Sequence, residues 1–122
     1  MKNEIIRIHN LSKSYGKLQA VKNISLNVYE GELFAFLGPN GAGKSTTINI
    51  LSTLLEKDAG EIEINQHILG KDNDKIRNDI GIVFQKSFLD DLLTVKENLI
   101  TRASFYGLEK SVITKRINTL SE

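Results

Sequence analysis

The sequence predicts an α/β fold, and three observations carry that prediction. First, short runs of isoleucine, valine and leucine that suit strands alternate with helix-patterned segments. Second, residues 33–37 are apolar throughout, which is typical of a strand buried on both faces of a parallel sheet. Third, 40% apolar and 25% charged residues in a chain of 122 match an ordinary globular domain and allow one domain at most.

Four further segments have the patterns of strands. Residues 5–10 form a β-branched run that ends before a turn signal. Residues 21–28 alternate apolar and polar side chains, which predicts a strand with one face in water. Residues 61–65 alternate in the same way, and residues 80–84 form another short β-branched run.

Three segments have the patterns of helices. Apolar residues recur at helical spacing over residues 48–55. The second helix is expected to begin at Thr94, because Thr94 and Glu97 form a capping box, and to end at Gly107. A third amphipathic pattern covers residues 112–120.

Composition excludes several classes of function. Sixteen Lys and Arg against 15 Asp and Glu leave a net charge of +1, so nucleic acid is not an expected partner. The absence of cysteine excludes disulfides, thiolate zinc sites and cysteine nucleophiles. His9 and His67 lack ligand spacing and are expected to be structural or exposed. No apolar run has the length of a membrane span, and the acidic Glu4 argues against a signal peptide.

The strongest chemical signal is a P-loop pattern, Gly38-Pro39-Asn40-Gly41-Ala42-Gly43-Lys44-Ser45. Its glycines let backbone N–H groups face inward at the positive end of the following helix, where a phosphate binds. Lys44 can reach the β- and γ-phosphates, the Ser45 hydroxyl can bind Mg²⁺, and Thr46 can add a hydrogen bond to phosphate. An ordinary glycine turn is the alternative, but it has no use for a Lys-Ser pair at the start of a helix.

Five segments, taken in order, resemble the ATP-binding subunit of ABC transporters. They are residues 14–16, 20–26, 30–32, the GPNGAGKST loop at 38–46, and residues 80–85. The resemblance spans nearly the whole chain. It implies an ABC-type P-loop NTPase fold with an N-terminal antiparallel β portion, ATP and Mg²⁺ as cofactors, and ATPase activity in the intact parent protein.

The resemblance also implies a division of the chain. Residues 1–37 correspond to the β-rich region on the adenine side, residues 38–85 to the core from the P-loop to the Q-loop, and residues 86–122 to the start of the helical subdomain. On this reading residues 1–122 are the N-terminal part of one truncated ABC-type domain.

Two site residues take their roles from the resemblance. Tyr15 occupies the place of the aromatic residue that stacks on adenine in this family; a turn tyrosine that shields the sheet edge is the alternative. Gln85 resembles the glutamine of the Q-loop, which touches Mg²⁺ and the attacking water when the site closes. Lys44 and Gln85 are therefore the expected catalytic residues, and Ser45 and Gln85 the expected metal contacts.

The resemblance implies two protein partners. Residues 86–93, from Lys86 to Leu93, resemble the surface that meets the transmembrane subunit, and residues 92–99 look most like export-type members. A second ATP-binding subunit is the other expected partner, and the implied location is cytoplasmic, at the inner face of the membrane. The acidic pair Asp90-Asp91 is not taken for a Walker B acid, because too few apolar residues precede it for a strand.

Several parts of the family's machinery are missing from these residues. The 122 − 85 = 37 residues after Gln85 contain no Ser-Gly-Gly signature, no apolar run ending in Asp-Glu and no switch histidine. Glu122 therefore resembles a truncation, and the chain alone is expected to turn over ATP poorly. Strands of apolar character without neighbours are also expected to make the chain self-associate.

Two other functions remain as alternatives. One is another P-loop enzyme, such as a GTPase or small-molecule kinase, although the sequence has no Asn-Lys-x-Asp for reading guanine. The other is an ABC-type module that binds ATP without transport, as in translation or DNA repair. The export-like residues 90–99 favour transport.

Overall fold

The computed structural model describes residues 2–38, 43–83 and 89–121. The chain forms two compact units, Met1–Ile82 and Val83–Glu122, and each is described here by itself. Within the described residues, no helix has both the length and the apolar character needed to cross a bilayer.

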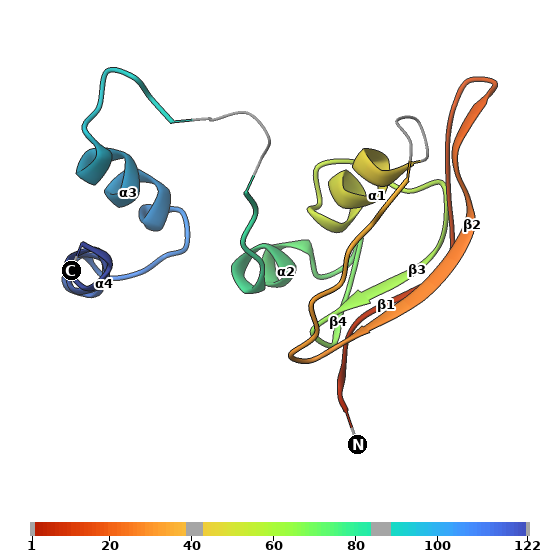
Figure 1. The fold of residues 1–122 in the computed structure, drawn as a ribbon, viewed down its shortest axis with the longest axis horizontal. Coiled ribbons are helices and arrows are strands. Elements are labelled where there is room, and N and C mark those ends of the chain that lie inside the picture. Colours follow the sequence, from red (N-terminus) through yellow and green to blue (C-terminus); the bar gives the residue numbers. More distant parts are fainter. Residues whose placement is uncertain (1, 39–42, 84–88, 122) are drawn as a thin grey trace. The chain divides into compact units, whose positions relative to one another are not determined.

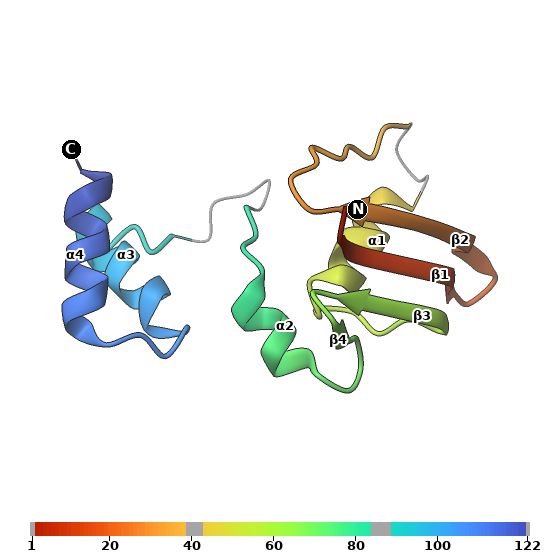
Figure 2. The ribbon, with the colours of Figure 1, turned by 90° about the horizontal axis from the view of Figure 1, so that it is seen from below.

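The first unit is built on a four-stranded antiparallel sheet in the order β2-β1-β3-β4 (Figures 1 and 2). The strands are β1 (Glu4–Tyr15), β2 (Leu18–Tyr29), β3 (Ala59–Ile64) and β4 (His67–Ile68). The β-branched run at residues 5–10 correctly predicted the first half of β1, and the alternating patterns correctly predicted most of β2 and β3. Two-residue turns join β1 to β2 and β3 to β4, and the second turn is possible because Asn65 and Gln66 both adopt positive φ.

Irregularities in β1 and β2 change the course of their hairpin. Asn10 and Asn23 adopt positive φ, and the register of β1 against β2 shifts on either side of Leu11. The Asn10 N–H donates to Ser25 Oγ at 2.9 Å and the Asn23 N–H to Ser12 Oγ at 3.1 Å, so these amides are satisfied outside the ladder. Bulges of this kind bend a strand and redirect its later side chains.

Two helices complete the first unit, α1 (Lys44–Leu51) and α2 (Asn73–Asp79). Ile50 of α1 and Ile76 of α2 are fully buried in one apolar cluster with the inward side chains of the sheet. The fully or nearly buried members of the cluster are Ile8, Leu11, Val21, Ile50, Ile62, Ile64, Leu69 and Ile76. This core holds the start of α1 against the hairpin of β1 and β2.

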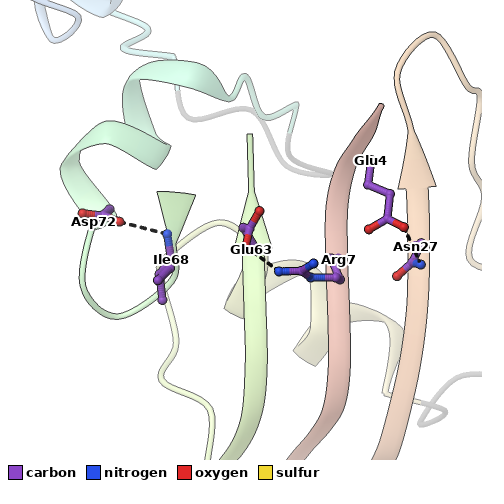
Figure 3. A network of polar contacts seen from close by, with 6 residues as sticks. All are labelled: Glu4, Arg7, Asn27, Glu63, Ile68 and Asp72. Carbon is purple, nitrogen blue, oxygen red and sulfur yellow. Dashed lines mark hydrogen bonds and ion pairs between the residues drawn. The ribbon is translucent and has the colours of Figure 1, made fainter. Parts of the chain in front are cut away.

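Polar contacts tie neighbouring strands together away from that core (Figure 3). The Arg7 guanidinium contacts the Glu63 carboxylate at 2.6 Å between β1 and β3. Asn27 of β2 donates to Glu4 of β1 at 3.2 Å. At the end of β4, the Ile68 N–H donates to the Asp72 carboxylate at 3.0 Å.

The second unit contains α3 (Val95–Ser104) and α4 (Lys110–Leu120), which pack against each other. The capping box predicted at the start of α3 is confirmed, since Thr94 Oγ1 accepts from the Glu97 N–H at 3.2 Å and Glu97 accepts from the Thr94 N–H at 2.7 Å. Gly107 has φ +67 and lies in the turn after α3, as predicted.

Two expected strands are not formed. Residues 33–37 belong to no strand, and Leu33 and Leu37 are almost fully exposed. Residues 80–83 also lie outside any ladder. The prediction of a buried parallel core was wrong for the described residues, because a strand forms only as part of a hydrogen-bonded ladder and no ladder of the described residues includes either segment.

The helix expected over residues 48–55 ends early, at Leu51. Thr53 adopts φ +63, a left-handed conformation that cannot continue an α-helix, and Leu54 is exposed. Helix α2 and strand β4 were not predicted. Helix α2 has seven residues with one buried side chain, and β4 has only two residues, so neither presents a readable period.

Candidate nucleotide-binding site

Helix α1 begins without a cap of its own. Its N-cap residue is Gly43, at φ +81, so no side chain accepts a hydrogen bond from the first turn. That turn also contains no acidic residue. The backbone N–H groups at a helix start carry partial positive charge, and here neither a side-chain oxygen nor a carboxylate of the helix neutralises it. This end of α1 is therefore suited to an anion.

Packing fixes the position of this helix end. A Cβ atom on Gly43 would lie 2.4 Å from the Ala20 carbonyl oxygen, so a glycine is required by the contact with β2 as well as by its φ. The buried Thr47 hydroxyl donates to the Gly43 carbonyl at 2.8 Å and closes the first turn. The start of α1 thus lies directly on the backbone of the hairpin.

A pocket of about 180 Å³ joins the P-loop residues to the end of β1. It is lined by Tyr15, Leu18, Ala20, Gly43, Lys44, Ser45 and Thr46. Ser45 is exposed, while Lys44 and Thr46 are partly buried. The Lys44 ammonium donates to the Gly38 carbonyl oxygen, so it lies back over the loop that precedes the helix.

The predicted site residues fall into two groups. The structure brings together Tyr15, Gly43, Lys44, Ser45 and Thr46 around one pocket, and Gly38 contacts the Lys44 amine. Pro39, Asn40, Gly41, Ala42 and Gln85 lie outside the described residues, as do residues 86–88 of the expected partner surface.

Tyr15 has a cation against its ring. The ring is about half exposed, and the Lys13 ammonium lies over it at 5.7 Å from the centroid. An ammonium in this position is attracted to the negative face of an aromatic ring. The same ammonium contacts the Asp58 carboxylate at 3.2 Å.

Asp58 is a residue that the sequence patterns did not single out. Its carboxylate accepts from the Ser14 N–H at 2.7 Å as well as from Lys13. The Ser14 hydrogen bond, followed by the Lys13 ammonium, holds the pKa of the Asp58 carboxyl below its ordinary value. No local signal identifies it, because its partners lie 44 and 45 positions earlier in the chain.

In the second unit, Asn98 is the residue with several polar contacts that the sequence patterns did not single out. Its side chain is buried, donates to the carbonyls of Asp90, Leu93 and Thr94, and accepts from the Asp90 N–H at 2.8 Å. Asn98 thereby holds the loop before α3. Asp90 and Asp91 are exposed in this loop, and the Asp90 carboxylate accepts from the Leu92 N–H. The one sequence signal for the burial of Asn98 was its position next to the apolar Leu99.

Among the residues that the structure describes, neither histidine belongs to a cluster of potential metal ligands. His67 Nε2 lies 3.3 Å from the Asp79 carboxylate, and His9 Nε2 lies 3.1 Å from the Asn10 amide. Over the described ranges, no three His, Cys, Asp or Glu side chains converge as a metal site. The oxygen ligand for Mg²⁺ that the P-loop pattern offers is the exposed Ser45 hydroxyl, beside an amine and a helix start that attract phosphate.

Comparison with known families agrees with this geometry. A family model described as "ABC transporter" matches residues 21–122. The chain belongs to this family.

Named relatives are ATP-binding proteins. The linearmycin resistance ATP-binding protein of Bacillus subtilis is 43% identical over 92% of this chain and 36% of its own length. The doxorubicin resistance ATP-binding protein of Mycobacterium tuberculosis is 37% identical over 94% of this chain and 35% of its own length. The maltose/maltodextrin import ATP-binding protein of Photorhabdus laumondii is 35% identical over 96% of this chain and 31% of its own length. This chain therefore spans about a third of the length of these relatives, which include import and resistance proteins.

Solved structures confirm the ABC-type fold. The ATP-binding subunit of an ABC transporter superimposes with a TM-score of 0.78 at 32% identity, over 88% of this chain and 45% of that one. A dimeric ATP-binding cassette in a post-hydrolysis state with ADP and Pi superimposes with a TM-score of 0.76 at 35% identity, over 91% and 53%. The fold is thus that of part of an ABC-type P-loop domain.

Proposed function

We propose that this chain binds MgATP in the pocket between Tyr15 and the start of α1, as part of the ATP-binding component of an ABC transporter. One observation carries the proposal: an uncapped helix start, a P-loop lysine and an aromatic ring line the same pocket in a chain of this family. The relative solved with ADP and Pi supports a nucleotide as the ligand.

The polar residues at the start of α1 have roles that follow from their chemistry, and Tyr15 takes its role from the family resemblance. The backbone N–H groups at the start of α1 bind phosphate oxygens, and the Lys44 ammonium leaves the Gly38 carbonyl to contact the β- and γ-phosphates. Ser45 contributes a hydroxyl oxygen to Mg²⁺, which when bound neutralises charge on the phosphates. Thr46 adds a hydrogen bond to phosphate. Tyr15 stacks on the adenine.

Hydrolysis by the intact parent protein is part of the proposal. Gln85 would contact Mg²⁺ and the attacking water, an assignment that is supported by its resemblance to the Q-loop glutamine. These 122 residues contain no Walker B acid, signature motif or switch histidine. Phosphoryl transfer depends on a positioned water and complete charge stabilisation, so these residues alone should turn over ATP poorly.

The partners and location follow from the same family. Residues 86–93 would contact a transmembrane subunit, and a second ATP-binding subunit would pair with this one, as in the dimeric relative. Such a complex places the chain in the cytoplasm, at the inner face of the membrane. Export is the direction we propose, and the two drug-resistance relatives support it.

The isolated chain should also self-associate. Leu33 and Leu37 belong to an unpaired apolar run and are almost fully exposed. Such a run pairs readily with another chain. Light scattering after size-exclusion chromatography should show oligomers, and a stable monomer would contradict this expectation.

The site is tested by replacing its lysine. Lys44→Ala should lower the affinity for MgATP at least about tenfold, because a charged group that contacts phosphate is lost. Isothermal titration calorimetry measures this affinity. Lys75→Ala, which removes the same charge from α2, is the matched control and should leave the affinity unchanged. Equal MgATP affinities of Lys44→Ala and the wild type would refute the site. If GTP displaces bound MgATP as effectively as ATP does, the alternative of a GTP-binding P-loop enzyme would be favoured.

A further inference from the structure

Asp58 joins the segment before β3 to the end of β1. The pairing of β1 with β3 is regular from Ile6 to His9, then breaks, and Ser12 with Ala59 is the last pair. Beyond that pair, the described contacts of β1 with this segment are made by Asp58. Its N–H donates to the Ser12 carbonyl at 3.0 Å, and its carboxylate accepts from the Ser14 N–H at 2.7 Å.

The other oxygen of the same carboxylate holds Lys13. The Lys13 ammonium lies 3.2 Å from Asp58 Oδ1, and only 14% of the lysine side chain is exposed. This ammonium lies over the Tyr15 ring. One carboxylate therefore fixes both the backbone next to Tyr15 and the cation against its ring.

A neighbouring contact leaves this segment little freedom. Gly60 has φ +99, and a Cβ atom there would lie 2.5 Å from the Asn10 carbonyl oxygen. The backbones of β1 and β3 are thus in direct contact at the break in pairing, two residues from Asp58. The backbone that carries the Asp58 carboxylate is therefore held in place against β1.

We propose that Asp58 is a positioning residue for the nucleotide base: it fixes residues 13–15 so that Lys13 covers one face of the Tyr15 ring and the other face receives the base. This inference rests on the proposed function, since it assigns how the base end of that site is built. Asp58 itself does not line the pocket. It acts on the ligand only through Tyr15 and Lys13.

The charge state of Asp58 agrees with this role. Hydrogen bonding from Ser14, and then from Lys13, lowers the pKa of its carboxyl, so the group is ionised at neutral pH. An ionised carboxylate forms stronger hydrogen bonds than a neutral amide in the same place. Asp58→Asn, which retains one acceptor oxygen but no charge, should therefore be intermediate between the wild type and Asp58→Ala.

The experiment compares two ligands that share phosphates and differ in the base. Asp58→Ala should lower the affinity for MgATP about five- to tenfold, because the contact between the base and the Tyr15 ring is partly lost. The affinity for magnesium tripolyphosphate should not change. In the Asp58→Ala/Tyr15→Ala double variant, MgATP affinity should equal that of Tyr15→Ala alone, since both changes remove the same contact. Calorimetry on the four proteins gives these values.

A control and a ligand-free measurement separate this inference from the proposed function. Glu63→Ala breaks the ion pair with Arg7 on the same sheet, outside the pocket, and should leave both affinities unchanged (Figure 3). Hydrogen exchange of the Ser14 amide should be faster in Asp58→Ala whether or not nucleotide is present. Faster exchange with unchanged MgATP affinity, equal losses for both ligands, or additive losses in the double variant would each overturn the positioning role. Absence of Lys44-dependent MgATP binding in the wild type would instead refute the proposed function, and this role with it.

Discussion

Helix α1 begins at Gly43 with no side-chain cap and no acid in its first turn, whereas helix α3 begins at Thr94 with a complete capping box. Both helices have four backbone N–H groups at this end that need partners. In α3 the Thr94 hydroxyl and the Glu97 carboxylate supply partners and negative charge. In α1 the same place along the helix is occupied by Thr46, which is neutral.

The difference separates a structural helix end from a ligand-binding one. A helix start that carries its own acid is electrostatically satisfied and repels a phosphate, while one that omits it leaves its partial positive charge available. The sequence GKST and the sequence TVKE thus give opposite electrostatic outcomes at the start of an α-helix. Substitutions at the two helix starts, and the pH dependence of the α3 start, test this difference.

The largest effect is expected from giving α1 the acid of α3. Thr46→Glu places a carboxylate at the third residue of α1, the position that Glu97 has in α3. MgATP affinity should fall more than about tenfold, because the carboxylate repels phosphate at short range. The helix itself should gain about 0.3–1 kcal/mol from the favourable charge at its N-terminus. Calorimetry and denaturant unfolding measure the two effects.

Thr46→Gln is the matched control for charge. It has the shape of the glutamate variant and also lacks the threonine hydroxyl, so a difference between the two variants reports the charge alone. If both variants bind MgATP equally, the electrostatic account of the α1 end is wrong.

A smaller effect is expected from removing the cap of α3. Thr94→Ala deletes the hydroxyl that accepts from the Glu97 N–H, which should cost about 1 kcal/mol of helix stability. Hydrogen exchange of the first-turn amides of α3 measures this loss. Thr101→Ala removes a threonine hydroxyl from the same helix, where it bonds the Glu97 carbonyl, and should have little effect. Equal protection in wild type and Thr94→Ala would show that the box does not stabilise α3.

The smallest effect is the pH dependence of the same helix start. Hydrogen bonding from the Thr94 N–H, and then from its side chain, holds the pKa of the Glu97 carboxyl below its ordinary value of 4.5. A carboxyl whose pKa is lower in the folded state than in the unfolded state stabilises the fold. This stabilisation is complete when the pH is above the unfolded-state pKa, and it is lost as the pH falls through the folded-state pKa. Exchange at the α3 start should therefore accelerate relative to Glu97→Gln between about pH 5 and pH 3. A constant ratio across this range would contradict the assignment.

Sequence reasoning succeeded where the interaction is local. Thr94 and Glu97 are three residues apart, so their capping box could be read directly and has the predicted geometry. The P-loop pattern is equally local, and its described members lie together at the start of α1. Tyr15 came from the family resemblance, and the structure places it on the same pocket.

Sequence reasoning failed where a distant partner decides the outcome. Residues 33–37 have the apolar character of a central strand, but a strand needs a neighbour, and none pairs with them in the described part of the chain. Asp58 was missed for the same reason, since its contacts with Lys13 and Ser14 depend on β1 and β3 coming together. The burial of Asn98 could not be predicted, because it depends on how the loop around Asp90 folds against α3.

At Gly43 and Ala20, main chain lies against main chain, with no room for even a methyl group between them. This contact sets how far the phosphate end of the pocket lies from the hairpin that carries Tyr15. Under the proposed function, this backbone contact limits the distance between the phosphates and the base of a nucleotide that fits the pocket. Side-chain substitutions can lower the affinity at either end of the pocket, but a shorter distance between α1 and β2 is excluded by the contact of Gly43 with Ala20.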